Sequence, residues 1–172
     1  MRKWFLPTLA FFCFIFESVF VSVLPSEIFG MERILVPRFV LIIVGFVAMF
    51  TKARTGMIYG VVLGLFYDLL YTNLIGVYMF GFTLLAYVVA WMSKFVQVNT
   101  FTVTIISLFM ITLLDFYVYG IQYLLGNTSI GVSEFLLIRL FPTLILNLAF
   151  VIFLFVPLRR QFFKIIDTNT DS

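Results

Sequence analysis

The chain has 172 residues, of which 63% are hydrophobic, 20% aromatic and only 11% charged, with a mean hydropathy of +1.18. A soluble domain of this size needs far more polar surface, so the composition excludes one and indicates a polytopic membrane protein. The formal net charge of +3 includes no dense basic patch, which excludes a nucleic-acid partner.

Histidine is absent and the only cysteine is Cys13. These two facts remove disulfides, Cys/His metal sites and histidine acid–base chemistry from consideration. We therefore predict neither a bound metal nor a cofactor. Cys13 lies in the first apolar stretch, where we expect it to pack as a small apolar side chain.

Six apolar stretches are predicted membrane-spanning helices, at residues 4–24, 36–50, 56–71, 75–92, 101–125 and 135–158. The second and third are short for a hydrocarbon core of about 30 Å, so we expect them to extend into their flanks or to cross where the bilayer thins. The first stretch resembles a signal peptide, but its length, Glu17 and the lack of a small-x-small cleavage site favour a retained span. The predicted fold is an all-α, six-helix bundle in one domain, residues 1–164, followed by a short polar cytoplasmic tail, residues 165–172.

The basic residues predict the orientation of this bundle in the plasma membrane. Of the eleven Lys and Arg residues, only Arg33 and Arg38 lie in or beside the loop between the first and second stretches, and Arg139 lies inside the sixth stretch. The remaining eight fall on the opposite side of the membrane from that loop: Arg2, Lys3, Lys52, Arg54, Lys94, Arg159, Arg160 and Lys164. Because short cytoplasmic loops are enriched in Lys and Arg, both termini are predicted to be cytoplasmic.

Five charged residues, Glu17, Arg38, Asp68, Asp115 and Arg139, lie inside or at the edge of apolar stretches. A charge at membrane depth costs several kcal/mol, so it is rarely kept without a partner or a task. The predicted topology places all five in the outer half of the bilayer, where we expect them to face one another as a polar cluster. We expect Asp68 or Asp115 to pair with Arg139, and Glu17 to pair with Arg38.

Helical spacing predicts which faces of three stretches point inward. Gly56, Gly60 and Gly64 recur every four residues on the face that leads to Asp68, which is typical of close helix packing. This glycine face indicates tight packing inside the bundle, with a partner groove or a homodimer contact as the alternative. Pro142 follows Arg139 in the sixth stretch, and we expect the helix to kink there. Two further stripes of polar residues share a face, namely Thr112, Asp115, Tyr119 and Gln122, and Arg139, Thr143 and Asn147.

Three interpretations of the polar cluster remain open: a structural lock between helices, a pocket for a ligand or partner, and catalysis. Two intramembrane aspartates suggest an aspartyl protease, and Tyr67-Asp68 matches half of its signature. The other half, Gly-x-Gly-Asp, is missing because Leu113 and Leu114 precede Asp115. The glycine spacing also fits a buried helix rather than a phosphate-binding loop. We therefore predict no enzyme and no catalytic residue.

Several of these segments together carry a family resemblance. They are Leu35-Val36-Pro37-Arg38-Phe39, the block from Gly56 through Gly60 and Gly64 to Tyr67-Asp68, Gly76-Val77-Tyr78, Leu114-Asp115-Phe116-Tyr117, and Arg139-Leu140-Phe141-Pro142-Thr143. The chain resembles the rod shape-determining protein MreD family, particularly its low-GC Gram-positive members, over most of its length. The most distinctive segment is the Gly-x3-Gly-x2-Tyr-Asp block with the Gly-x-Tyr that follows it.

The resemblance implies a non-enzymatic component of the bacterial cell-elongation complex that supports cell shape and lateral peptidoglycan synthesis. Implied partners are an MreC-like bitopic protein, an MreB-like filament, a SEDS glycosyltransferase, a transpeptidase and membrane lipids. It also implies a six-helix arrangement like that of the substrate-binding subunits of energy-coupling-factor transporters. The alternative function is a small-molecule-binding or transport subunit with a polar pocket in the outer half of the bundle.

Overall fold

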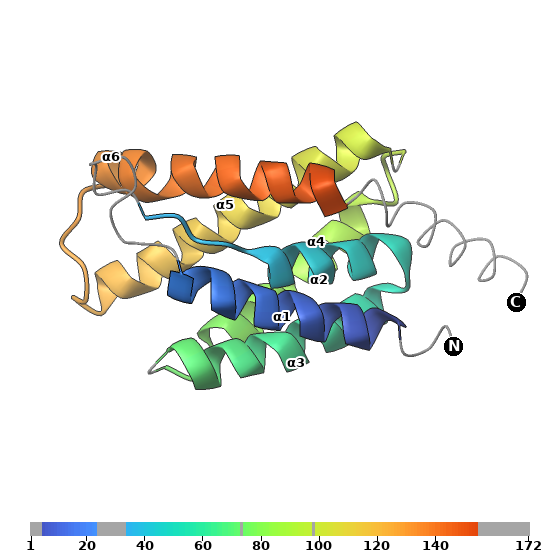
Figure 1. The fold of residues 1–172 in the computed structure, drawn as a ribbon, viewed down its shortest axis with the longest axis horizontal. Helices are drawn as coiled ribbons and strands as arrows, with labels where there is room; N and C mark the ends of the chain where they lie inside the picture. The colour runs from blue at the N-terminus through green and yellow to red at the C-terminus, as the bar shows by residue number, and fades with distance from the viewer. Residues whose placement is uncertain (1–4, 24–33, 73, 98, 155–172) are drawn as a thin grey trace, which may run out of the picture.

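The computed structural model describes residues 5–23, 34–72, 74–97 and 99–154, and these residues form an all-helical bundle (Figure 1). Five helices are α1 (Phe5–Val23), α2 (Phe39–Phe50), α3 (Ala53–Tyr71), α4 (Val77–Met92) and α5 (Thr100–Leu124). A sixth and last helix, Val132–Leu154, begins as α6 (Val132–Phe135), passes through the π-helical segment η2 (Leu136–Leu140) and continues as a helix to Leu154. The predicted ends agree with these bounds to within three residues wherever both are described. The predicted tail, residues 165–172, lies outside the described residues.

Four of the helices, α1, α3, α5 and the span Val132–Leu154, are long and apolar enough to cross a membrane. The predicted second and fourth spans correspond to shorter helices, α2 with 12 residues and α4 with 16. At 1.5 Å per residue, α2 is about 18 Å long and cannot cross the hydrocarbon core alone. Residues 34–38, of which 36–38 belong to the predicted second span, are extended and reach the middle of the bundle before α2 begins (Figure 1).

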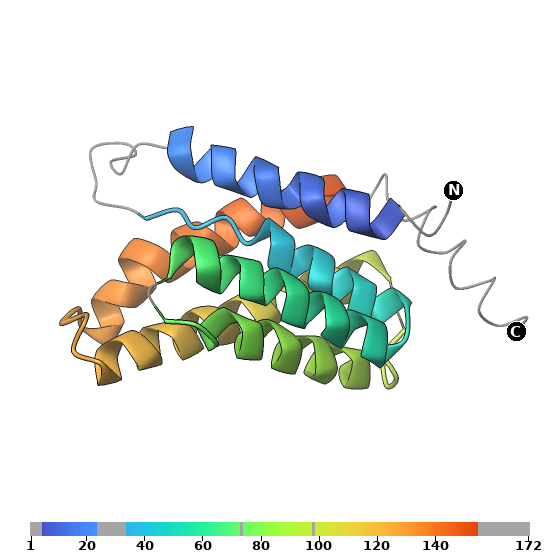
Figure 2. The same ribbon diagram turned by 90° about the horizontal axis from the view of Figure 1, so that it is seen from below.

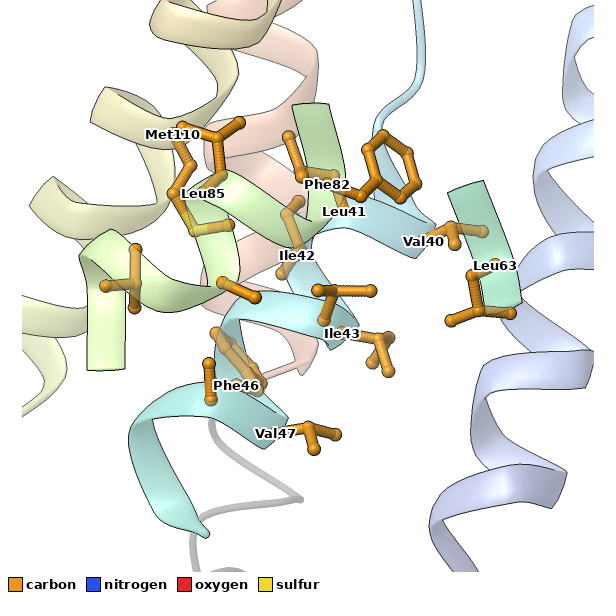
Figure 3. Packing of buried hydrophobic residues seen from close by; sticks show 14 of the residues in the cluster. Val40, Leu41, Ile42, Ile43, Phe46, Val47, Leu63, Phe82, Leu85 and Met110 are labelled. Atoms are coloured by element: carbon orange, nitrogen blue, oxygen red, sulfur yellow. The ribbon is translucent and has the colours of Figure 1, made fainter. Parts of the chain in front are cut away.

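Helix α2 is the centre of the core, and all 12 of its residues are buried. It contacts α1, α3, α4 and α5. Figure 2 shows α1 on one side of the bundle and α4 and α5 on the other, with α2 between them. A helix that is apolar on all sides either spans a membrane or is enclosed by protein, and α2, which is too short to span, is enclosed. Figure 3 shows α2 side chains beside those of α3, α4 and α5, with labels on Val40, Leu41, Ile42, Ile43, Phe46, Val47, Leu63, Phe82, Leu85 and Met110.

The glycine face of α3 packs against other helices of the same chain. A Cβ atom added to Gly56 would lie 2.6 Å from the Cβ of Ala48 in α2. One added to Gly64 would lie 2.6 Å from the Cα of Met79 in α4, and Gly60 approaches the backbone of α4 in the same way. The absence of side chains at these positions is what lets α3 and α4 approach so closely. This face is therefore filled by α2 and α4 and is not open to a partner.

Candidate functional site

Asp68, near the end of α3, caps the N-terminus of α4. Its Oδ2 accepts hydrogen bonds from the backbone N–H groups of Gly76 (2.8 Å) and Met79 (3.0 Å), and its Oδ1 accepts one from Tyr78 (2.8 Å). Gly76 has a φ of 109°, a conformation that glycine adopts without steric penalty. The fully buried carboxylate thus satisfies N–H groups that have no partner within α4 and lies at the positive end of its dipole.

Glu17, in α1, has a similar role at the N-terminus of α2. Its Oε2 accepts a hydrogen bond of 2.9 Å from the backbone N–H of Val40, and the backbone N–H of Phe39 also interacts with the carboxylate. The Glu17 side chain is buried, although α1 is mostly exposed on its other faces. This contact explains how α2 can begin in the interior, because the carboxylate supplies acceptors that water cannot provide there.

The central contact of the site is an ion pair between Arg38 and Asp115. Arg38 Nη2 lies 2.6 Å from Asp115 Oδ1, and Arg38 Nε donates to the same oxygen at 3.2 Å. Arg38 Nη1 donates to the hydroxyl of Tyr78 at 3.4 Å, and its guanidinium lies 5.4 Å from the centre of that ring. Both charged side chains are at most 2% exposed. The pair joins the start of α2 to the middle of α5, and Tyr78 links it to the α4 terminus that Asp68 caps.

Residues 34–38 are held against the last helix by hydrogen bonds that replace those of a regular helix. Asn147 Oδ1 accepts from the Arg38 N–H at 2.8 Å, and Asn147 Nδ2 donates to the carbonyl of Val36 at 3.0 Å. The hydroxyl of Thr143 accepts from the Val36 N–H at 3.2 Å. Extended backbone at membrane depth is tolerated where protein groups satisfy it in this way.

Pro142 provides one more acceptor for this extended segment. Proline has no N–H, so the carbonyl of Ile138, four residues earlier, lacks its usual helical donor. That carbonyl accepts a hydrogen bond of 2.9 Å from the backbone N–H of Ile34. The π-helical segment η2 ends at Leu140, two residues before Pro142, and the kink expected at Pro142 stays a prediction.

Arg139 differs from the other four charged residues of the predicted cluster. It is only partly buried, and its Nε is a buried atom without a hydrogen-bond partner. Within the described part of the chain its guanidinium forms no ion pair and no hydrogen bond. Arg139 lines a cavity of about 470 Å³ between the α3–α4 connection, α5 and the start of the last helix.

The expected pairings were wrong, because the ion pair among the described residues is Arg38–Asp115. Asp68 does not pair with Arg139, since both of its oxygens accept backbone hydrogen bonds. Glu17 interacts electrostatically with Arg38 but is hydrogen-bonded to the start of α2. Tyr78 was missed as a member of the site, although the Gly76-Val77-Tyr78 segment was part of the family resemblance.

The secondary polar stripe has separate local roles. Thr143 and Asn147 hold the extended segment, as described above. The hydroxyl of Tyr119 donates to the carbonyl of Ile130 at 2.7 Å. Gln122 Oε1 accepts from Asn127 Nδ2 at 2.8 Å. These last two bonds fix the connection between α5 and α6, which forms one wall of the Arg139 cavity.

Comparisons with known proteins show similarity over nearly the whole chain. The family model for the rod shape-determining protein MreD matches residues 2–166. The chain is 35% identical over 165 residues to the rod shape-determining protein MreD of Bacillus subtilis (strain 168), covering 96% of both chains. No solved structure matches, so the expected likeness to energy-coupling-factor subunits stays a prediction.

The chain belongs to the MreD family of rod shape-determining proteins. It is therefore a non-enzymatic membrane component of the cell-elongation machinery that determines rod shape.

Proposed function

We propose that this protein is a rigid membrane scaffold that binds the single span of an MreC-like partner and so supports lateral peptidoglycan synthesis. Through that partner it would act beside an MreB-like filament, a SEDS glycosyltransferase and a transpeptidase. The observation that carries the proposal is that Glu17, Arg38, Asp68 and Asp115 bind groups of this chain. Their bonds fix how helices α1 to α5 are placed, which is a structural task.

A partner's span would bind to the lateral surface of the bundle. The glycine face is filled internally, whereas α3, α4, α5 and the last helix carry large apolar side chains that are exposed at their outer surfaces. Helices associate in a bilayer by close packing rather than by exclusion of water. A scaffold with a fixed shape favours such packing, because less ordering is needed on binding.

The alternative, a small-molecule-binding or transport subunit, has less support. Its pocket was expected to use Glu17, Asp68 and Asp115 together with Arg139. The first three are engaged in bonds within the chain, and only Arg139 lines the cavity described above. Transport would require these bonds to break.

Cross-linking from defined faces tests the scaffold proposal. In a Cys13→Ala background, single cysteines replace Val62, Leu84, Ile105 or Ile145, which are exposed on α3, α4, α5 and the last helix. Each variant is labelled with a benzophenone maleimide in membranes that also contain the tagged MreC-like partner. We expect cross-links to the partner's span from one face, and the unmodified chain, whose cysteine is buried, serves as the negative control.

Two results would contradict the proposal. One is that the partner fails to copurify with the folded, monodisperse wild-type protein. The other is that all four faces cross-link to the partner equally, as random collisions would produce.

The orientation with both termini in the cytoplasm also stays a proposal. The α2–α3 and α4–α5 connections, which carry Lys52 and Lys94, and the first turn of α3, which carries Arg54, lie at the same end of the bundle as the start of α1 (Figure 1). This common end supports the positive-inside assignment. A cysteine at Arg54, again in the Cys13→Ala background, should be protected from a membrane-impermeant maleimide in intact cells, whereas one at Thr128 should react. The opposite pattern would reverse the orientation.

A further inference from the structure

A cavity of about 470 Å³ lies between the α3–α4 connection, α5 and the start of the last helix. Its polar lining includes Tyr78, which belongs to the site described above, and Tyr71, Thr72, Tyr119, Gln122, Asn127, Thr128, Glu134 and Arg139. Ile34, Leu74 and Ile138 supply apolar surface on its walls. The volume and the mixture of a few polar groups with apolar walls are those of a small-molecule site.

Arg139 is the cationic group that lines this cavity, and it forms no ion pair or hydrogen bond within the described part of the chain. Asp115 lies near enough for its charge to act on Arg139, but its Oδ1 accepts two hydrogen bonds from Arg38, and its buried Oδ2 has no hydrogen-bond partner in the described part of the chain. Asp68 is occupied by the start of α4. The Arg139 guanidinium therefore has no direct partner among the described residues, and the repulsion of its charge by Arg38 is only partly offset by Asp115. An arginine in this position favours an anion, since its planar fork matches a phosphate or carboxylate.

The local backbone adds a second observation. Arg139 lies in the π-helical segment Leu136–Leu140, which ends two residues before Pro142. Short π-helical segments are rare and occur frequently at functional sites. In this chain the segment coincides with the only described arginine that lines a cavity without a partner.

We propose that this cavity binds the anionic phosphate headgroup of a membrane lipid, with Arg139 as its main contact. The elements that line the cavity, namely the α3–α4 connection, the end of α5 and the start of the last helix, lie at the end of the bundle opposite the start of α1 (Figure 1), where helix ends meet the headgroup layer. Its apolar walls offer surface for the first part of an acyl chain, which a free anion would not use. Glu134 is an exposed residue that also lines the cavity, and its negative charge would repel the anion. Removing that charge should therefore strengthen binding. The inference is independent of the proposed partner.

Binding can be measured with purified protein in nanodiscs or by titration in neutral detergent. The probes are phosphatidylglycerol, phosphatidylcholine and inorganic phosphate, and the readout is lipid retention by native mass spectrometry together with thermal stabilisation. Arg139→Gln removes the charge, and Arg54→Gln removes an exposed arginine at the other end of the bundle. Leu74→Trp narrows the cavity without changing any charge, and Glu134→Gln removes the rim carboxylate.

We expect the wild type to prefer phosphatidylglycerol over phosphatidylcholine. Arg139→Gln should weaken phosphatidylglycerol binding about tenfold, which corresponds to about 1.4 kcal/mol, and Leu74→Trp should also weaken it. Arg54→Gln should leave binding unchanged, and Glu134→Gln should strengthen it. A response to inorganic phosphate equal to that of the lipid would overturn the lipid assignment in favour of a free anion. Equal binding by wild type and a folded Arg139→Gln variant would overturn the site.

Discussion

Arg38 and Arg139 begin the second and sixth predicted spans, yet the bundle treats them differently. Arg38 is enclosed, with hydrogen bonds from Nε and Nη2 to Asp115 and from Nη1 to Tyr78. Arg139 lines an open cavity and its buried Nε has no partner. The same residue type at a similar predicted depth is thus part of a closed network in one place and a free binding group in another.

The difference shows that the role of a charged side chain in this bundle depends on which groups it contacts and not on its depth in the membrane. A buried charge whose bonds are complete is strongly destabilising to disturb, because its partner is left uncompensated. A charge without a partner contributes little to the fold and is available to a ligand. The predictions below follow this contrast, from the substitutions that should disturb the fold most to the one that should disturb it least.

Replacing Arg38 should have the largest effect on stability. Arg38→Met keeps an apolar stem but leaves the Asp115 carboxylate buried without its cation. We expect a loss of about 3–5 kcal/mol in the free energy of unfolding. Denaturation of the purified protein by sodium dodecyl sulfate, followed by circular dichroism, would measure the loss.

A double variant tests whether the two residues act as a pair. Arg38→Met combined with Asp115→Leu removes both charges and should recover part of the lost stability. Effects of the two substitutions that simply add would show that the ion pair is not the reason for the loss.

Replacing the carboxylates that cap α4 and α2 should have the next largest effect. Asp68→Ala leaves three backbone N–H groups at the start of α4 without their acceptor, and we expect a loss of about 2–3 kcal/mol. Glu17→Ala should lower the free energy of unfolding less, because Glu17 accepts one hydrogen bond of regular geometry, from Val40, whereas Asp68 accepts three. Unfolding free energies of the two variants measure this order. A greater loss for Glu17→Ala would contradict the assignment of Asp68 as the stronger cap.

The close approach of α3 and α4 predicts a smaller effect at Gly64. A Cβ there would lie 2.6 Å from the Met79 Cα, so Gly64→Ala should force the two helices apart at a cost of about 2 kcal/mol. Gly120, in α5, is the matched control because nothing lies within 4 Å of its added Cβ. Gly120→Ala should be neutral or stabilising by up to about 1 kcal/mol. Melting temperatures of the two variants in the same detergent would distinguish these outcomes, and equal shifts would argue against the close contact.

The sequence predicts the helices and the enclosed positions of Glu17, Asp68 and Asp115 because both follow from the cost of polar groups in lipid. It does not predict which charge contacts which, since that depends on how each helix is rotated. It also gives no sign that α2 begins at Phe39, because Val36 and Pro37 continue the apolar stretch. Pro142 indicates from the sequence alone that the Ile138 carbonyl lacks a helical donor. The sequence does not indicate that Ile34, which lies over 100 residues earlier, donates to it.

Replacing Arg139 should disturb the fold least, and this prediction tests the contrast most directly. Arg139→Met removes a guanidinium without described bonds, and it also removes repulsion between the charges of Arg139 and Arg38. We therefore expect the free energy of unfolding in neutral detergent to change by less than about 1 kcal/mol. A loss as large as that of Arg38→Met would show that Arg139 belongs to the closed network. If stability is kept in neutral detergent while stabilisation by phosphatidylglycerol is lost, the two arginines have the separate roles that their contacts indicate.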